Sequence, residues 1–450
     1  MKGGGAEASA LRVSARMNAA RYLPLVAAFA ALWLTVVGLY AQRSDAFPES
    51  RHHPAMRYGA TQPADVAAGV NARLERGELA LTFEPGGRGY LKSVLDAFGI
   101  SPTSQALVYS QTSLQASYIS AANPRAVYFN DDISVAWVRG APLLEVAAQD
   151  PRLGTVFYQL GQTDGPTPRF NRSETCLSCH LSWDTRAVPG VFVMSTFPRK
   201  SDRDYASGGL TDHREPLSRR WGGWYVTGAK VPRRHMGNTA LIGPHAVGPE
   251  QMAPPPVFAT LADAPALRGI GDYLTPHSDI AALLVLEHQM HAMNLMTRAA
   301  WEHRLVTPAA LADALVDVNH EPVLTARVRE AVDELADYLL FVDEVPLGTV
   351  QGASGFTEWF SAQGPKDASG RSLRELRLED RLMKYPLSYT IYSKAFASLP
   401  PAVRQATYRR LETVLSAAKP EPKYTHLTAV DRRAVLDLLR ATKDDLPGVF

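Results

Sequence analysis

The sequence predicts an α+β protein with three parts: a small antiparallel β-meander, an irregular middle segment and a mainly α-helical C-terminal half. The meander is predicted because short runs rich in Val, Tyr, Phe, Trp and Ile alternate with turn residues between positions 106 and 160. The middle segment, 188–260, is rich in Gly, Pro and aromatic residues and has no regular period. After residue 277, apolar residues recur at helical spacing.

The first part of the chain contains a segment that directs export. Residues 23–40 are apolar throughout and come after four basic residues. A run of this length after basic residues can cross a bilayer and places the rest of the chain outside the cytoplasm. Because residues 39–41 (Leu-Tyr-Ala) make a poor cleavage site, we expect 1–42 to remain as a membrane anchor, with a cleaved signal peptide as the alternative.

The next elements are predicted from local composition. Residues 43–63 are polar, contain Pro and Gly without a period, and predict a linker. Two short helices are expected between 65 and 98, because helical spacing is interrupted by a glycine-rich stretch. The predicted strands lie in four runs, 106–115, 125–140, 142–150 and 154–160.

The C-terminal half is predicted as a series of helices. Ser278 or Asp279 is expected to cap the first of them, which runs to about Arg304. The remaining predicted helices are 308–318, 325–342, 373–381, 388–397, 401–417 and 429–441. We therefore expect a domain at 64–275 that contains the meander, and a helical domain at 276–450 that packs on it.

Charge and length limit the class of protein. The chain has 450 residues, with 47 Lys and Arg against 45 Asp and Glu. The near-zero net charge gives no indication of the excess positive charge that nucleic-acid-binding proteins carry. At this length more than one domain is expected, so most of the chain lies outside any single short motif.

The two cysteines of the chain lie in one motif, Cys176-Leu177-Ser178-Cys179-His180. This spacing is the pattern that attaches haem covalently: each thiol adds to a haem vinyl group, and the imidazole becomes the proximal iron ligand. A disulfide is the alternative in an oxidising compartment, but it would close a very short loop and leave His180 without a role. We predict one covalent haem c, wrapped by the irregular segment.

The motif resembles the Cys-x-x-Cys-His signature of c-type cytochromes. The resemblance implies thioether bonds from Cys176 and Cys179, proximal ligation by His180, and completion of haem attachment outside the cytoplasmic membrane. The stretches RWGGWYVTG, RHMGN and LEHQMHAMN are similar to stretches in large single-haem proteins with a cytochrome c domain. Here strands precede the motif, whereas single-haem c domains usually place it at the end of a helix.

The iron ligand opposite His180 separates an electron carrier from an enzyme. A sulfur or a second imidazole gives a haem suited to electron transfer, and an open position lets peroxide, oxygen or a substrate bind. His235 or Met236 is the first candidate, because the pair lies in a glycine-bounded loop after the aromatic stretch 221–225. The alternative is a His235 that caps local backbone and a Met236 in the core. The other candidates are Met194, His213, His245, Met252, His277, His288 and His291.

The helix predicted after residue 277 carries polar residues on one side. At 100° per residue, Glu287, His291 and Asn294 share a side of a helix that is otherwise apolar. Buried polar groups need partners, which a haem edge, a distal cavity, a metal or a closed polar network would supply. We predict Glu287, His288 and His291 as general acid and base if the protein is an enzyme.

Basic and aromatic residues between 219 and 225 are predicted to contact the haem. Arg219 and Arg220 would pair with the two haem propionates, because a guanidinium matches a carboxylate with two hydrogen bonds. Trp221 and Trp224 would pack on the haem face or edge. A solvated basic rim and an ordinary aromatic core are the alternatives.

Three functions fit these features. The first is electron transfer to or from a redox partner protein at the periplasmic side of the cell inner membrane, with a soluble periplasmic protein as the alternative after cleavage. The second is a haem oxidoreductase of peroxidase or oxidase type, which would account for the length and for the polar helix. The third is a haem-based sensor or structural module.

Overall fold

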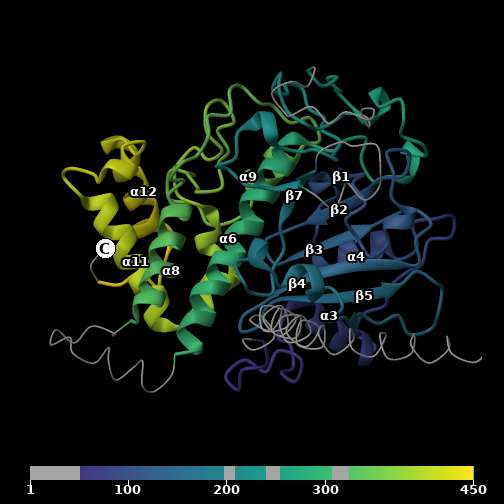
Figure 1. The fold of residues 1–450 in the computed structure, drawn as a ribbon, viewed down its shortest axis with the longest axis horizontal. Coiled ribbons are helices and arrows are strands. Elements are labelled where there is room, and N and C mark those ends of the chain that lie inside the picture. Colours follow the sequence, from purple (N-terminus) through teal and green to yellow (C-terminus); the bar gives the residue numbers. More distant parts are fainter. Residues whose placement is uncertain (1–50, 197–207, 240–253, 307–323, 449–450) are drawn as a thin grey trace, which may run out of the picture. The chain divides into compact units, whose positions relative to one another are not determined.

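The computed structural model describes residues 51–196, 208–239, 254–306 and 324–448. The chain divides into two compact units, residues 1–57 and residues 58–450, and the elements below belong to the second unit (Figure 1). The predicted membrane anchor and the predicted helix at 308–318 lie outside the described residues. Within those ranges, every helix is too short or too polar to cross a membrane.

The predicted meander is confirmed as an antiparallel sheet with strands in sequence order. Its strands are β1 (Ala106–Val108), β2 (Arg125–Phe129), β3 (Ile133–Trp137), β4 (Leu143–Asp150), β5 (Gly154–Gly161) and β6 (Asn171–Arg172). Along β4 every second residue is buried, as expected when the two faces of a sheet differ in cover. One face packs against the two predicted short helices, α3 (Val66–Glu75) and α4 (Leu91–Phe98).

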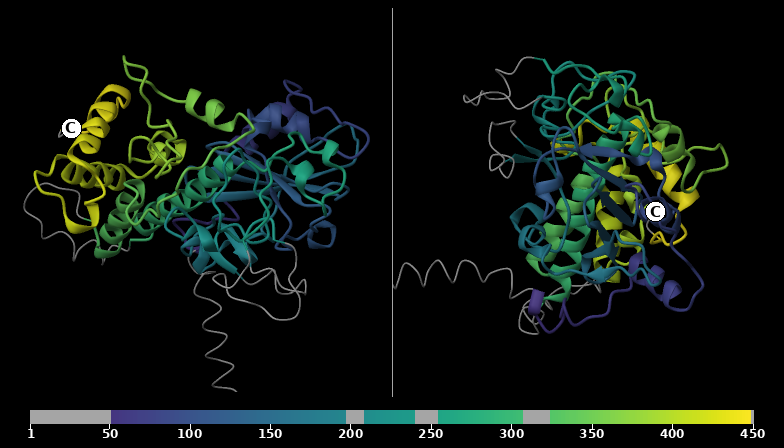
Figure 2. Two further views of the ribbon diagram at one scale, coloured as in Figure 1. Left: turned by 90° about the horizontal axis from the view of Figure 1, so that it is seen from above. Right: turned by 90° about the vertical axis from the view of Figure 1, so that its right-hand side faces the viewer.

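The central element of the unit is the long helix α6 (Ile280–Arg304). The Asp279 carboxylate caps its first turn by accepting a hydrogen bond from the backbone N–H of Ala281, as the sequence predicts. The helix lies between the sheet and the C-terminal helices (Figures 1 and 2), which explains why it is buried along most of its length.

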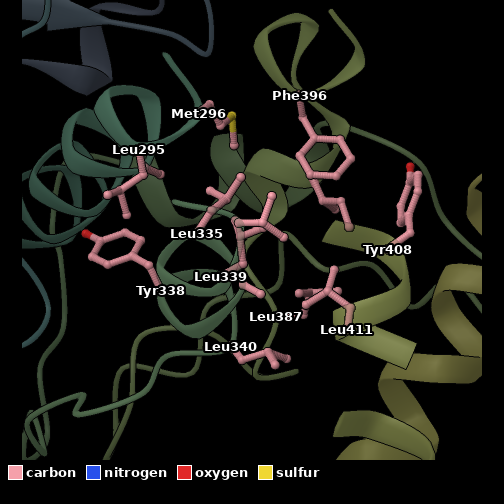
Figure 3. Packing of buried hydrophobic residues seen from close by; sticks show 14 of the residues in the cluster. Leu295, Met296, Leu335, Tyr338, Leu339, Leu340, Leu387, Phe396, Tyr408 and Leu411 are labelled. Atoms are coloured by element: carbon pink, nitrogen blue, oxygen red, sulfur yellow. The ribbon is translucent and has the colours of Figure 1, made fainter. Parts of the chain in front are cut away.

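The C-terminal half is helical, as predicted. Its helices are α8 (Ala326–Leu339), α9 (Phe356–Ala362), α10 (Lys394–Ala397), α11 (Pro401–Ser416) and α12 (Ala429–Thr442). Of these, α9 lies in a stretch where the sequence pattern predicts no helix. Apolar side chains of α6, α8 and α11 meet in one buried cluster (Figure 3). A second cluster joins residues of the sheet to residues of α6 and α9, so both predicted domains contribute to one hydrophobic core.

Two predicted helices differ from the structure. The helix predicted at 373–381 is absent from this described segment, because Arg374 turns toward Asp131 in an ion pair of 2.7 Å and Leu378 has a φ of 58°. The helix predicted at 388–397 is two short turns, η9 (Tyr389–Tyr392) and α10. Ser393 separates them, because its hydroxyl accepts from the N–H of Phe396 and starts a new helix.

The segment predicted as irregular contains a short hairpin that the sequence pattern did not indicate. Its strands are β7 (Val193–Thr196) and β8 (Gly208–Thr211). The backbone at Gly222 lies so close to β7 that a Cβ there would collide with the carbonyl oxygen of Thr196. Glycine at this position therefore lets the aromatic stretch 221–225 pack directly on β7.

Candidate functional site

The Cys-x-x-Cys-His motif forms a single helical turn. The turn α5 (Leu177–His180) begins after Cys176, whose carbonyl accepts a hydrogen bond of 3.0 Å from the N–H of His180. Residues at positions i, i+3 and i+4 share one face of a helix, so Cys176, Cys179 and His180 project from the same side. Cys176 is half-buried, Cys179 is exposed, and both are free thiols. Leu177, between the two cysteines, is buried and anchors the turn.

The imidazole of His180 has a defined tautomer. Its Nδ1 lies 3.0 Å from the carbonyl oxygen of Gly190, and a carbonyl can only accept, so Nδ1 carries the proton. The ring is packed near Phe157 and Phe192, with centroid distances of 4.9 and 5.4 Å. Burial lowers the pKa of His180 to about 4, against the opposing effect of the Gly190 hydrogen bond. The ring is therefore neutral near pH 7, and its Nε2 lone pair is available to a metal.

Asn294 on α6 holds the loop that orients His180. Its side-chain amide donates to the carbonyl of Val191 at 2.7 Å and accepts from the N–H of the same residue at 3.2 Å. A Cβ at Gly190 would collide with the Asn294 side chain, so glycine is required for this close approach. Asn294, one of the polar residues of α6, thus holds the backbone segment whose Gly190 carbonyl fixes the orientation of the His180 ring.

The four residues predicted to contact haem have other partners in this structure. Arg219 is exposed and lies 3.9 Å from Glu215. Arg220 is fully buried and donates to Glu287 and to the backbone carbonyls of Glu215 and His213. The indole N–H groups of Trp221 and Trp224 donate to the Glu287 carboxylate and to the Met194 carbonyl, respectively. These contacts form an ion-pair network and an aromatic core.

Glu287 is the centre of the first network on α6. Its carboxylate lies 2.5 Å from the Arg220 guanidinium and 3.1 Å from Trp221 Nε1, and both charged side chains are fully buried. Trp221 has a φ of 67°, a region that L-residues rarely adopt, and its indole is fixed by the Glu287 bond. Burial raises the pKa of Glu287 to about 7, whereas Arg220 and Trp221 act to lower it.

His288 belongs to a second network. Its Nδ1 lies 2.9 Å from Nδ1 of His213, and its Nε2 lies 2.7 Å from the Ser388 hydroxyl. The rings of Tyr338 and Phe341 stack on it, with centroid distances of 5.1 and 4.6 Å. Burial lowers the pKa of His288 to about 3 and that of His213 well below its usual value. Both rings are therefore neutral, with one donating to the other.

His291 faces a cavity of about 260 Å³. Arg214 donates to its Nε2 at 3.0 Å and pairs with the Asp212 carboxylate at 2.6 Å. Because a guanidinium can only donate, Nε2 is the acceptor and the proton of the neutral ring sits on Nδ1. That nitrogen lies 3.8 Å from Asp212, beyond direct hydrogen-bonding reach. The cavity is lined by Trp183, Arg186, Leu210, Asp212, Arg214, Glu215 and His291.

The two candidate distal ligands lie in different environments. Met236 is buried, and its sulfur lies 3.8 Å from the Ser195 hydroxyl on β7, as in an ordinary core. His235 is also buried, and within the described ranges neither of its ring nitrogens has a hydrogen-bond partner. Burial lowers its pKa to about 4. Of the other candidates, His245 and Met252 lie outside the described residues, and Met194 is half-buried on β7.

No protein-family model, curated protein or solved structure matches this chain. In the described parts of the chain, no group of three or more His, Cys, Asp and Glu side chains is placed to hold a metal ion. The networks of Glu287 and His288 are linked, because Arg220 donates both to Glu287 and to the carbonyl of His213, whose ring bonds His288. His291 instead pairs with Arg214.

Sequence reasoning missed Arg214, which fixes the tautomer of His291, and Asp212, which pairs with Arg214. They precede α6 by more than 60 residues, so no local periodicity links them to it. The only signal is that ionisable residues are consecutive in the run Asp212-His213-Arg214. Other charged residues surround this run, so neither its burial nor its partner can be predicted from the sequence.

The buried histidines predict loss of stability in acid. Burial lowers the pKa values of His235, His288 and His291 to about 4, 3 and 3. Below pH ~6.5 these imidazoles bind protons in the unfolded protein but stay neutral in the folded protein. The free energy of unfolding therefore falls as the pH decreases toward 4. Each of these residues contributes on the order of 1.4 kcal/mol per pH unit in that window.

Two carboxyl groups oppose this trend. The pKa values of Glu287 and Glu344 are raised to about 7 by burial, so these groups favour the folded state as the pH falls from 7 toward 4.5. Because the histidines outnumber them, we expect the urea midpoint to decrease between pH 7 and pH 5. His235→Leu, which removes an imidazole that has no hydrogen-bond partner among the described residues, should make that decrease shallower. A midpoint that rises in acid would contradict the prediction.

Proposed function

We propose that this protein is an exported c-type cytochrome that binds one haem covalently and transfers electrons. The observation that carries the proposal is the face of the α5 turn. It presents two free thiols and a neutral imidazole whose Nδ1 is already bonded to Gly190. Thioether formation needs accessible thiols at this spacing, and iron ligation needs an available Nε2 lone pair.

Each residue of the motif has a role in this proposal. Cys176 and Cys179 form the two thioether bonds, and His180 supplies the proximal ligand. The Gly190 carbonyl holds the Nδ1 proton, which fixes the ring orientation and increases the basicity of the ligating nitrogen. When bound, the haem supplies a one-electron redox couple at its iron. Asn294 holds the Val191 backbone and thereby maintains the position of Gly190.

The proposed location rests on the sequence. The apolar run at 23–40 would anchor the chain in the inner membrane with residues 43–450 on the periplasmic side, and a cleaved form would be soluble in the periplasm. A redox partner protein at that face would then exchange electrons with the haem.

The deciding experiment is covalent haem analysis of the protein expressed with an export and haem-attachment system. We expect the band on a denaturing gel to retain haem stain, and we expect intact-mass analysis to give one haem per chain. A protein that loses all haem on denaturation, or that carries a Cys176–Cys179 disulfide instead, would refute the proposal.

A second candidate, a haem oxidoreductase, is favoured by the cavity at His291. The cavity is lined in part by Trp183 and Arg186, which follow the motif within a few residues. The Nδ1–H group of His291 lies 3.8 Å from the Asp212 carboxylate, too far for a direct hydrogen bond. Such a group suits proton transfer to a bound substrate. The ferric optical spectrum separates the two functions. A high-spin spectrum that shifts with cyanide or peroxide supports the enzyme, and a low-spin spectrum inert to both supports the carrier.

A further inference from the structure

The two faces of the β-sheet differ in cover beside the haem motif. On the face packed against α3 and α4, residues such as Tyr128, Val135 and Val146 are fully buried. On the opposite face, the middle of the sheet is only half-buried. This half-buried patch consists of Arg125, Val127, Ala136, Glu145 and Ala147.

The patch is continuous with the surroundings of His180. Ala136 on β3 lies directly opposite Glu145 on β4. Ala147, two residues further along β4, lies opposite Phe157, and Phe157 packs against the His180 ring at 4.9 Å. Side chains two residues apart on a strand share a face. Glu145 therefore lies on the same face of the sheet as the ring that supports His180.

Two opposite charges occupy this patch. Arg125 Nη1 lies 3.5 Å from Glu145 Oε2, and the side chains are only 18% and 19% exposed. The Ser113 hydroxyl lies 3.1 Å from both carboxylate oxygens. Because both side chains are mostly buried, water and salt screen the electric field of each charge less than they screen the field of a surface charge.

Both charges reach the motif. The strand pairing places the Arg125–Glu145 pair on the face of the sheet that carries Phe157, and Phe157 packs against the His180 ring. The electrostatic potential at the motif therefore depends on both members of the pair, with opposite signs.

We propose that Arg125 and Glu145 set the reduction potential of the redox centre held by Cys176, Cys179 and His180. This inference rests on the proposed function. One-electron oxidation leaves one more positive charge at the centre, and the electron goes to the partner or the electrode without any bond being made or broken. The Arg125 cation opposes that added charge and raises the potential, whereas the Glu145 anion favours it and lowers the potential.

The experiment is a spectroelectrochemical titration of the haem-loaded full chain. Arg125→Gln is expected to lower the midpoint potential and Glu145→Gln to raise it. Each shift should correspond to about tenfold in the ratio of oxidised to reduced protein, or ~59 mV for one electron. Arg125→Lys, which keeps the charge, should retain the original potential, and the double Gln variant should lie between the single variants.

Controls separate the possible failures. Arg377→Gln alters an ion pair with Asp380 that is 40% and 59% exposed, so its potential should be unchanged. If every variant carries covalent haem on a denaturing gel but the potentials of Arg125→Gln and Glu145→Gln do not move, or move in the same direction, the inference is overturned while the proposed function stands. If the unsubstituted chain carries no covalent haem, both are overturned.

Discussion

A chain in which Cys176 and Cys179 are both replaced by serine is expected to lose all covalently bound haem. Serine cannot form the thioether bonds, and the bond from His180 to iron would not survive denaturation. Each single variant should keep one thioether. The measurement is haem stain after denaturing electrophoresis, with intact mass for the number of bonds. These are the only two cysteines in the chain, so no other thiol can substitute.

The matched control lies within the same turn. Ser178→Ala removes a hydroxyl that donates to the Thr175 carbonyl at 2.9 Å, on an exposed side chain between the two cysteines. Haem attachment should be complete in this variant. Full haem stain in the double serine variant would show that the attachment occurs elsewhere, and the role given to α5 would be wrong.

Replacing Arg220 with methionine is expected to lower the free energy of unfolding by about 3–5 kcal/mol, because it leaves the buried Glu287 carboxylate without its cation. Both side chains are fully buried, so water cannot solvate the remaining charge. The guanidinium also donates to the carbonyls of Glu215 and His213, and these bonds are lost as well. Urea unfolding monitored by circular dichroism measures the loss.

The pH dependence and a second variant test the cause. An unpaired buried carboxyl prefers to be protonated, so the loss in Arg220→Met should be smaller at pH 5 than at pH 8. Adding Glu287→Gln, which keeps an acceptor for Trp221 Nε1, should recover part of the stability. Arg377→Met, at an exposed ion pair, should change stability little. An equal loss at both pH values would indicate lost packing as the cause.

The secondary structure was predictable wherever one face of an element is buried in a regular pattern. The strands between 106 and 160 and the helices at 401–416 and 429–442 are predicted by alternation and helical spacing. The hairpin of β7 and β8 could not be predicted in this way. Its strands are four residues each, and they are stabilised by the packing of residues 221–225, which lie outside both strands.

The hydrogen-bond partners of the buried polar residues lie far from them in the sequence. Glu287 and His291 could be predicted as buried from the apolar character of the helix around them. That Glu287 pairs with Arg220, and His291 with Arg214, could not, since each pair spans more than 60 residues. The sequence predicts a propionate as the partner of Arg220 because a guanidinium fits any carboxylate equally well, and composition alone does not say which one lies nearby.

Local order along the chain is enough to predict the attachment motif, because its thiols and imidazole lie within five residues and a single helical turn brings them to one side. The tautomer of His180 depends on Gly190 and, behind it, on Asn294 more than 100 residues away. The charges of Arg125 and Glu145 reach the motif only because the meander packs beneath it. The sequence by itself determines that the two thiols and the imidazole share one helical turn, whereas the orientation of the His180 ring depends on groups that folding brings together.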